Sequence, residues 1–208
     1  MGERKMDRSL SIRTTGIREW QSGEVHYNRY EPTPYAALDR LFQNYNMGQD
    51  ARVVDFGCGR GRVAFYIHKR FGIPVTGIEV NDKTYEEAIS NKTAYRAKAK
   101  HIKAPIRFEY GHAEDYQVKS TDNRFYFFNP FSIKIFRKVV GNILESVREN
   151  PRSVDLIIYY PTAQYKQFLK KDTPFELINK VRIPKALDKK EKFLIYRLRQ
   201  EDIDSNTG

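Results

Sequence analysis

One stretch decides the fold: RVVDFGCGRGR, residues 52–62. Its first half is a short apolar run, which predicts a buried strand over 52–56. The alternating glycines that follow, Gly57, Gly59 and Gly61, allow a sharp turn whose N–H groups come close to a ligand. From about Arg62 the apolar spacing becomes helical. A strand, a glycine-rich turn and a helix in this order are typical of ligand sites in α/β proteins.

The spacing of the glycines differs from the dinucleotide fingerprint G-x-G-x-x-G, because Arg62 stands where the third glycine would be. A pyrophosphate also needs the helix N-terminus left open. Asp55, just ahead of the glycines, places an acid where it can favour a cation or accept hydrogen bonds from an amine. The turn alone still leaves a dinucleotide dehydrogenase open.

Outward from this stretch, strand and helix patterns alternate along the chain. Strands are predicted over 52–56, 75–80, 106–110, 125–129 and 154–160, and helices over about 34–45, 62–71, 82–101, 132–147 and 162–171. Thr33 and Ser132 are the predicted N-caps of two of these helices. The segments FELINKVRIP and KFLIYRLR then follow each other with only a polar loop between them, so they should pair antiparallel.

These elements predict a single α/β domain. Its doubly wound, mostly parallel seven-stranded sheet should carry helices on both faces and end in a C-terminal antiparallel β-hairpin. Glu79 ends the second strand, where an acid can accept both hydroxyls of a ribose; the competing reading is a surface carboxylate. The third strand leads into GHAEDY (111–116), where side-chain and backbone groups can bracket an adenine edge.

This series of motifs resembles that of the class I, Rossmann-like methyltransferases that use S-adenosyl-L-methionine (SAM), over about residues 30–199. The resemblance implies that Asp55 and the glycine loop hold the amino-acid end of SAM, Glu79 the ribose, and His112 with Ala113 the adenine. The family most often has Asp where His112 stands. The full set of cofactor-binding residues predicted in this way is Tyr30, Thr33, Asp55, Gly57, Cys58, Gly59, Gly61, Glu79, Val80, His112, Ala113 and Asn129.

The fourth strand ends in Asn129, Pro130 and Phe131, which are the predicted catalytic residues. They resemble the N-P-P-[YF] signature of amino-methyltransferases, with one proline fewer. In that signature the Asn side chain and the following carbonyl accept hydrogen bonds from a planar NH₂ group, and the aromatic ring stacks on the acceptor. The competing interpretation is a plain strand-to-helix turn, in which proline ends the strand.

Upstream, Tyr30 and Thr33 lie in a T-P segment similar to one that folds over the cofactor in several amino-methyltransferases. Thr33 followed by Pro34 is also a good helix start, and both readings can hold together. Cys58 is interpreted as a packing residue of the glycine loop. His26, His68 and His101 lack ligand spacing, so no metal site is expected.

Composition and charge limit the partners. The net charge is +11, and residues 165–200 contain eleven Lys/Arg against four Asp/Glu, a surplus that could contact phosphates or could be a solvated surface. The single cysteine excludes an internal disulfide. The N-terminus has no apolar signal region, and the apolar runs are too short to span a membrane, so a cytoplasmic protein with no membrane partner is expected.

The sequence therefore predicts a SAM-dependent methyltransferase. N-methylation of a macromolecule is favoured, with RNA or DNA slightly ahead of protein. The alternatives are a small-molecule methyltransferase and a SAM-binding module without turnover. The expected organisation is an N-terminal extension (1–29), a methyltransferase domain (30–200) and a C-terminal tail (201–208), with the oligomeric state left open.

Overall fold

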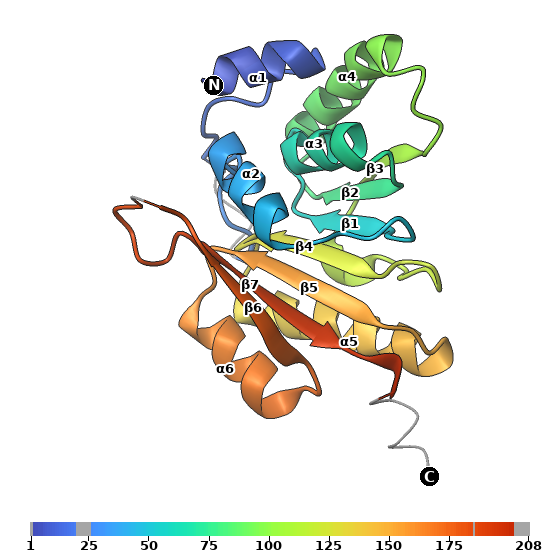
Figure 1. Ribbon diagram of the computed structural model, residues 1–208, viewed down its shortest axis with the longest axis vertical. Coiled ribbons are helices and arrows are strands. Elements are labelled where there is room, and N and C mark those ends of the chain that lie inside the picture. Colours follow the sequence, from blue (N-terminus) through green and yellow to red (C-terminus); the bar gives the residue numbers. More distant parts are fainter. Residues whose placement is uncertain (1, 20–25, 185, 202–208) are drawn as a thin grey trace.

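The computed structural model describes residues 2–19, 26–184 and 186–201. One seven-stranded sheet forms its centre, with the strand order β3-β2-β1-β4-β5-β7-β6 (Figure 1). The strands are β1 (Val53–Phe56), β2 (Val75–Glu79), β3 (Ile106–Tyr110), β4 (Arg124–Phe128), β5 (Val154–Tyr159), β6 (Glu176–Arg182) and β7 (Lys192–Leu198). Strands β1 to β5 are parallel, and β7 lies antiparallel between β5 and β6. The predicted fold class is confirmed.

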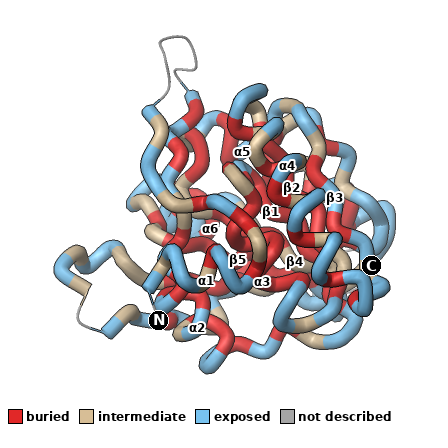
Figure 2. Tube along the Cα trace, turned by 90° about the horizontal axis from the view of Figure 1, so that it is seen from above, coloured by how far each residue is buried: buried red, intermediate tan, exposed pale blue. Residues whose placement is uncertain are grey.

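Helices cover both faces of the sheet. They are α1 (Glu3–Leu10), α2 (Tyr35–Asn44), α3 (Arg62–Phe71), α4 (Asp82–Lys98), α5 (Ile133–Glu149) and α6 (Ala163–Asp172), with a short 3₁₀ turn, η1 (Ala113–Asp115). Helices α1 to α4 lie on one face and α5 with α6 on the other (Figure 1). Each layer buries its own apolar cluster against the sheet, and β1 and β5 are buried along their whole length (Figure 2). Within the described residues, every helix is too short or too polar to cross a membrane.

The predicted elements agree with the observed bounds to within about three residues. Of the two predicted helix caps, Thr33 is wrong, whereas Ser132 occupies the N-cap position of α5 but forms no side-chain capping hydrogen bond. The Thr33 hydroxyl pairs with the hydroxyl of Tyr126 at 2.8 Å, and α2 begins after Pro34 without a side-chain cap. Ser132 does precede α5, yet its hydroxyl lies 3.3 Å from Nδ1 of His26. In both cases the hydroxyl contacts a residue distant in the sequence instead of a backbone N–H of the helix. Local sequence preferences cannot predict such a contact.

A helix that the sequence patterns did not predict, α1, packs against the start of α3. The link between them is Arg62, whose side chain is only 3% exposed. Its guanidinium pairs with Glu3, donates to the Thr14 hydroxyl at 2.7 Å and lies 4.4 Å from the centre of the Tyr35 ring. These contacts with α1 and its neighbours hold the Arg62 side chain, which explains why an arginine can occupy the position of a third glycine.

Candidate functional site

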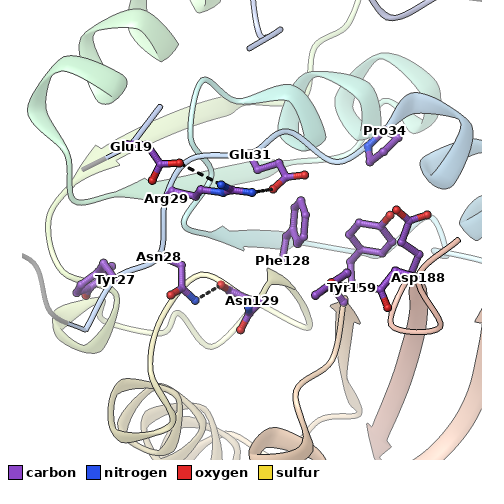
Figure 3. Close-up of a pocket in the computed structure, with 12 residues that line it drawn as sticks. Glu19, Tyr27, Asn28, Arg29, Glu31, Pro34, Phe128, Asn129, Tyr159 and Asp188 are labelled. Carbon is purple, nitrogen blue, oxygen red and sulfur yellow. Dashed lines mark hydrogen bonds and ion pairs between the residues drawn. The ribbon is translucent and has the colours of Figure 1, made fainter. Parts of the chain in front are cut away.

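The candidate site lies at the carboxyl ends of the parallel strands, the edge at which open α/β sheets bind ligands. The largest cavity there has a volume of about 680 Å³ (Figure 3), and two small ones of about 40 and 20 Å³ lie beside the glycine turn. Glu31 and Phe128 line all three cavities, so these two residues mark the point where the cavities meet.

The glycine turn is tightly covered by other parts of the chain. Gly57 and Gly59 have φ angles of +72° and +56°, in the left-handed region that side chains rarely adopt. A Cβ at Gly57 would meet Pro130, and one at Gly59 would overlap the ring of Tyr30. Cys58 is buried with its Sγ against Gly77, in agreement with a packing role. The turn therefore exists only because glycines let neighbouring groups approach the backbone.

Glu79 holds the glycine turn to the end of β2. One of its carboxylate oxygens accepts the N–H of Gly59 at 2.8 Å, and the other accepts the N–H of Asn81 at 2.9 Å. Burial raises its pKa to about 6, although those backbone hydrogen bonds oppose the rise. The predicted ribose ligand is thus a buried carboxylate at the predicted strand end, beside Val80, and both residues line the 40 Å³ cavity.

Asp55 is the least satisfied polar group of the site. It lies in β1, one residue before the end of the strand, and lines the 20 Å³ cavity, but its Oδ2 has no hydrogen-bond partner within the described residues. Burial, and then the nearby charge of Glu79, raise its pKa to about 8. A buried, unpaired acid beside a second acid is a place for a cationic group, because a positive charge would relieve both.

On the other side of Glu79, the segment after β3 is already occupied by a tyrosine. The N–H of Ala113 donates to the Tyr27 hydroxyl at 3.1 Å, and that hydroxyl donates to Glu114 at 2.6 Å. The exposed ring of His112 lies 5.8 Å from that of Tyr27. His112 and Ala113 therefore border the position predicted for an adenine, but Tyr27 now fills part of it.

Tyr27 belongs to a strap, residues 26–31, that crosses the mouth of the site. The strap pairs with the segment after β4: the N–H of Asn28 donates to the Pro130 carbonyl at 2.9 Å, and the N–H of Ser132 donates to the His26 carbonyl at 2.7 Å. The Asn28 side chain donates to the carbonyl of Asn129 at 2.6 Å. Figure 3 shows this last contact at the lower edge of the large cavity.

The three predicted catalytic residues are separated by this arrangement. Asn129 lines the large cavity, with a left-handed φ of +40°. Pro130 packs on Gly57, and its carbonyl is taken by the strap. Phe131 is 1% exposed and packs against Tyr27, so its ring does not border the cavity. From this part of the chain, the aromatic side chain that lines the cavity is Phe128, at the end of β4.

The large cavity is acidic and aromatic. Among the described residues, its charged lining consists of Glu19, Glu31, Asp188 and Glu191 with one cation, Arg29, and its aromatic lining of Tyr27, Phe128, Tyr159 and Tyr160. Arg29 bridges Glu19 at 3.0 Å and Glu31 at 3.3 Å, which leaves the two hairpin carboxylates without that cation (Figure 3). Burial and the nearby charges of Glu191 and Glu31 raise the pKa of the Tyr159 hydroxyl. The cavity thus favours a positively charged or strongly hydrogen-bond-donating guest.

Two predicted residues from the T-P segment lie beside the glycine turn. The ring of Tyr30 covers Gly59 and its hydroxyl donates to the Thr14 carbonyl at 2.5 Å, while Thr33 is buried against Tyr126. Both line the 20 Å³ cavity. The carboxylates of the large cavity were not foreseen, because nothing in the local pattern around Glu31 or Asp188 distinguishes them from surface residues.

Comparison with known proteins gives one curated relative and many similar folds. No protein-family model matches the chain. A protein-lysine N-methyltransferase of Saccharolobus islandicus is 36% identical over 63 residues, which are 30% of this chain and 39% of the relative. This chain therefore aligns with about two fifths of that relative's length.

Solved structures match the fold over most of the chain. A candidate RNA methyltransferase from Pyrococcus horikoshii matches with a TM-score of 0.57 and 17% identity, over 94% of this chain and 97% of its own. Fibrillarin from Aeropyrum pernix, solved with SAM, matches with a TM-score of 0.55 and 16% identity, over 78% of this chain and 73% of its own. A tRNA (uracil-54, C5)-methyltransferase from Pyrococcus abyssi, solved with S-adenosyl-L-homocysteine, matches with a TM-score of 0.55 and 16% identity, over 79% of this chain and 38% of its own. This chain has the Rossmann-like fold of the class I SAM-dependent methyltransferases.

Proposed function

We propose that this protein is a SAM-dependent N-methyltransferase whose acceptor is the amine of a lysine side chain in a protein. The observation that carries the acceptor is the large cavity, where four carboxylates and several aromatic rings surround a space that meets the glycine turn at Glu31 and Phe128. Such surroundings attract an ammonium group and pack against an aliphatic chain. The protein-lysine N-methyltransferase that matches part of the chain supports the same acceptor.

The residues at the glycine turn fit SAM. The unpaired Oδ2 of Asp55 suits the ammonium of its amino-acid end, and the glycine backbone suits the approach of a ligand. Glu79 would hold the ribose hydroxyls, and the Ala113 N–H would meet the adenine edge. When bound, the cofactor supplies an already activated methyl group, so the chain has to contribute positioning and electrostatics.

The cofactor cannot enter without movement of the strap. The cavity beside Glu79 measures about 40 Å³, room for about one water molecule. Tyr27 and Tyr30, both in the strap, cover Ala113 and Gly59. We therefore propose that residues 26–31 shift when SAM binds and close over it afterwards.

The chemistry asked of the acceptor site is simple. The cavity carboxylates attract the lysine ammonium, which loses one proton to a carboxylate or to water of this open cavity. The neutral amine then donates its N–H groups to Glu31 and to the side-chain oxygen of Asn129, which turns the nitrogen lone pair toward the glycine turn. Phe128 and Tyr159 flank the lysine chain. No metal takes part in this scheme.

A nucleic-acid acceptor, slightly favoured by the net charge, fits the cavity less well. Phosphates would be repelled by the four carboxylates. The planar-amine arrangement also needs the Pro130 carbonyl and a stacking aromatic ring. That carbonyl already accepts the Asn28 N–H, and the Phe131 ring is buried.

The direct test is transfer of a tritiated methyl group from SAM to fractionated protein, RNA, DNA and metabolite pools of a cell that lacks the gene. We expect label in the protein fraction, recovered as methyl-lysine after hydrolysis. Label in the RNA or DNA fraction would reject the lysine acceptor. SAM binding without transfer to any pool would indicate that the protein is a SAM-binding module without turnover.

A pair of variants tests the role of Glu31. Glu31→Gln should lower kcat/KM for the lysine substrate about 10- to 100-fold, because a hydrogen bond to a charged group is lost where the cavities meet. Glu19→Gln removes the other carboxylate that pairs with Arg29, but Glu19 lines only the large cavity. It should lower kcat/KM less than about threefold. Equal losses in steady-state assays would assign the effect to Arg29 instead.

A further inference from the structure

A cluster of like charges lies on the C-terminal hairpin and the helix α6, next to the large cavity. We call it the basic patch: Lys166, Lys180, Arg182 and Lys192. Arg182 and Lys192 are direct partners in the antiparallel pairing of β6 with β7. Lys180 is two residues from Arg182, so it stands on the same face of the sheet. That face is the one covered by α6, which carries Lys166.

The charge of Asp188 acts on Lys192 from nearby, but the basic patch is not neutralised by ion pairs among the residues that the structure describes. Within the described residues, no carboxylate forms an ion pair with any of its four members. The side-chain ammonium of Lys192 donates to the Lys189 carbonyl, at 2.6 Å. Burial lowers the pKa of Lys192, and the charges of Lys180, Lys166 and Arg182 lower it further, whereas Asp188 raises it; Lys192 therefore lies within electrostatic reach of the other three members. Like charges placed directly opposite each other destabilise a sheet.

Protection of the sheet edge does not account for this arrangement. Lysines on an edge strand discourage pairing with other chains, and β6 is the edge strand. Lys192, however, is on β7, which is paired on both sides, and Lys166 is on a helix. A cluster drawn from two strands and a helix is better explained by an anionic partner.

The basic patch is continuous with the acceptor cavity. Lys192 directly follows Glu191, a cavity residue, and its carbonyl accepts the N–H of Tyr160 at 3.1 Å. Lys190 lies over the Tyr160 ring, 5.9 Å from its centre. An acidic cavity therefore opens beside a basic surface. A bound chain must present a cation to the first and anions to the second.

We propose that the basic patch docks an acidic segment of the protein substrate that lies beside its acceptor lysine. This inference rests on the proposed lysine acceptor. A polypeptide can carry a lysine flanked by Asp and Glu, which matches both surfaces at once. A nucleic acid supplies only the anions and has no cation for the cavity, so charge complementarity selects the acidic peptide.

The test uses the full chain, SAM and peptides with one central lysine flanked by glutamates, by glutamines or by lysines. At low salt we expect kcat/KM to be about tenfold higher for the glutamate peptide than for the glutamine peptide, and lowest for the lysine peptide. The preference should fade at high salt. Equal methylation of all three peptides would overturn the docking proposal and leave the lysine acceptor intact.

Charge reversal supplies the matched control. Lys180→Glu with Arg182→Glu should abolish or invert the preference. Lys100→Glu with Lys103→Glu changes the net charge equally, at exposed positions before β3 on the opposite edge of the sheet, and should keep it. A result in which both pairs act alike would overturn the proposal, because the effect would then belong to the net charge.

Binding is measured separately, so that docking is tested even without turnover. A fluorescent glutamate-rich peptide with no lysine should bind the wild-type chain and the control variant. It should bind the Lys180→Glu/Arg182→Glu variant at least about tenfold more weakly. No binding to the wild type would overturn docking. Tighter binding of a single-stranded RNA of equal length, lost in the same variant, would replace the acidic peptide by nucleic acid.

Discussion

At the scale of single residues, the site is built around two buried acids, Asp55 and Glu79. Glu79 is stabilised by two backbone N–H groups, whereas Asp55 has an oxygen without a partner. Arg62 is close in sequence but pairs with Glu3, and so does not neutralise them. The protein thus keeps a buried acid ready for a cation instead of satisfying it internally, which is typical of functional sites.

The raised pKa of Asp55 makes a prediction about pH and stability. Its pKa rises from 3.8 to about 8, because of burial first and Glu79 second. An acid whose pKa is higher in the folded state stabilises the fold below pH 4, and this contribution is lost as the pH rises through about 8. Asp55→Asn should therefore raise the free energy of unfolding at pH 8 by about 1–3 kcal/mol and change it little near pH 4.

Urea unfolding at both pH values measures this difference. Asp115→Asn, at an exposed position, serves as the control and should follow the wild type at both. The same Asp55→Asn variant should bind SAM more weakly, since an amide cannot ionise in response to the ammonium group of the amino-acid end. Parallel pH profiles of wild type and Asp55→Asn would contradict a raised pKa for this carboxyl.

At the scale of elements, the strap decides what the site can accept. Residues 26–31 extend the segment after β4 through main-chain hydrogen bonds, and they cover the glycine turn with Tyr30. The strap also supplies Glu31 and Arg29 to the large cavity. One short segment therefore both covers the proposed cofactor position and lines the proposed acceptor position. A shift of the strap at the first position would also change the lining of the second.

Tyr27 links the strap to the predicted adenine position, and its hydroxyl can be tested alone. Tyr27→Phe removes the hydrogen bonds of that hydroxyl to Ala113 and Glu114 and keeps the ring. We expect SAM to bind about 2- to 10-fold more tightly, because the Ala113 N–H no longer has to exchange one partner for another. Isothermal calorimetry measures the affinity. Weaker binding would show that the hydroxyl itself contacts the cofactor.

At the scale of the whole molecule, the first residues of the chain belong to the same folded body as the sheet. Asp7 in α1 is 4% exposed and accepts the Thr14 N–H at 2.5 Å, the Thr14 hydroxyl at 2.7 Å and the Tyr35 hydroxyl at 2.7 Å. Through Thr14 and Arg62 this network reaches the start of α3. The helix α1 is thus linked to the residue that follows the glycine turn, Arg62.

The network around Asp7 predicts a large effect on stability from a small change. Asp7→Asn should lower the free energy of unfolding by about 2–3 kcal/mol, since a buried acceptor of several hydrogen bonds is replaced by a weaker one. Asp39→Asn, whose side chain is 52% exposed, should cost less than about 1 kcal/mol. Denaturant unfolding compares the two. Similar small losses would make α1 a peripheral element.

Charge is also distributed unevenly over the molecule. The chain carries a net +11, yet its largest cavity is lined by four carboxylates. The net charge of the chain suggested a polyanion as partner, whereas the carboxylates of the cavity favour a cation. Net charge describes long-range attraction, but an acceptor is selected by the groups within a few ångströms of it.

The amino-acid sequence by itself determined the layered sheet, its terminal hairpin and the glycine turn with Asp55 and Glu79. These follow from patterns that repeat within a few residues, and local patterns need no knowledge of distant contacts. Only the tertiary structure decided the lining of the large cavity, because Glu31 comes from the strap and Asp188 and Glu191 from the hairpin loop. The burial of Phe131 behind Tyr27 was decided in the same way. Side chains far apart in the sequence meet there only after the chain has folded, so no local pattern carries that information.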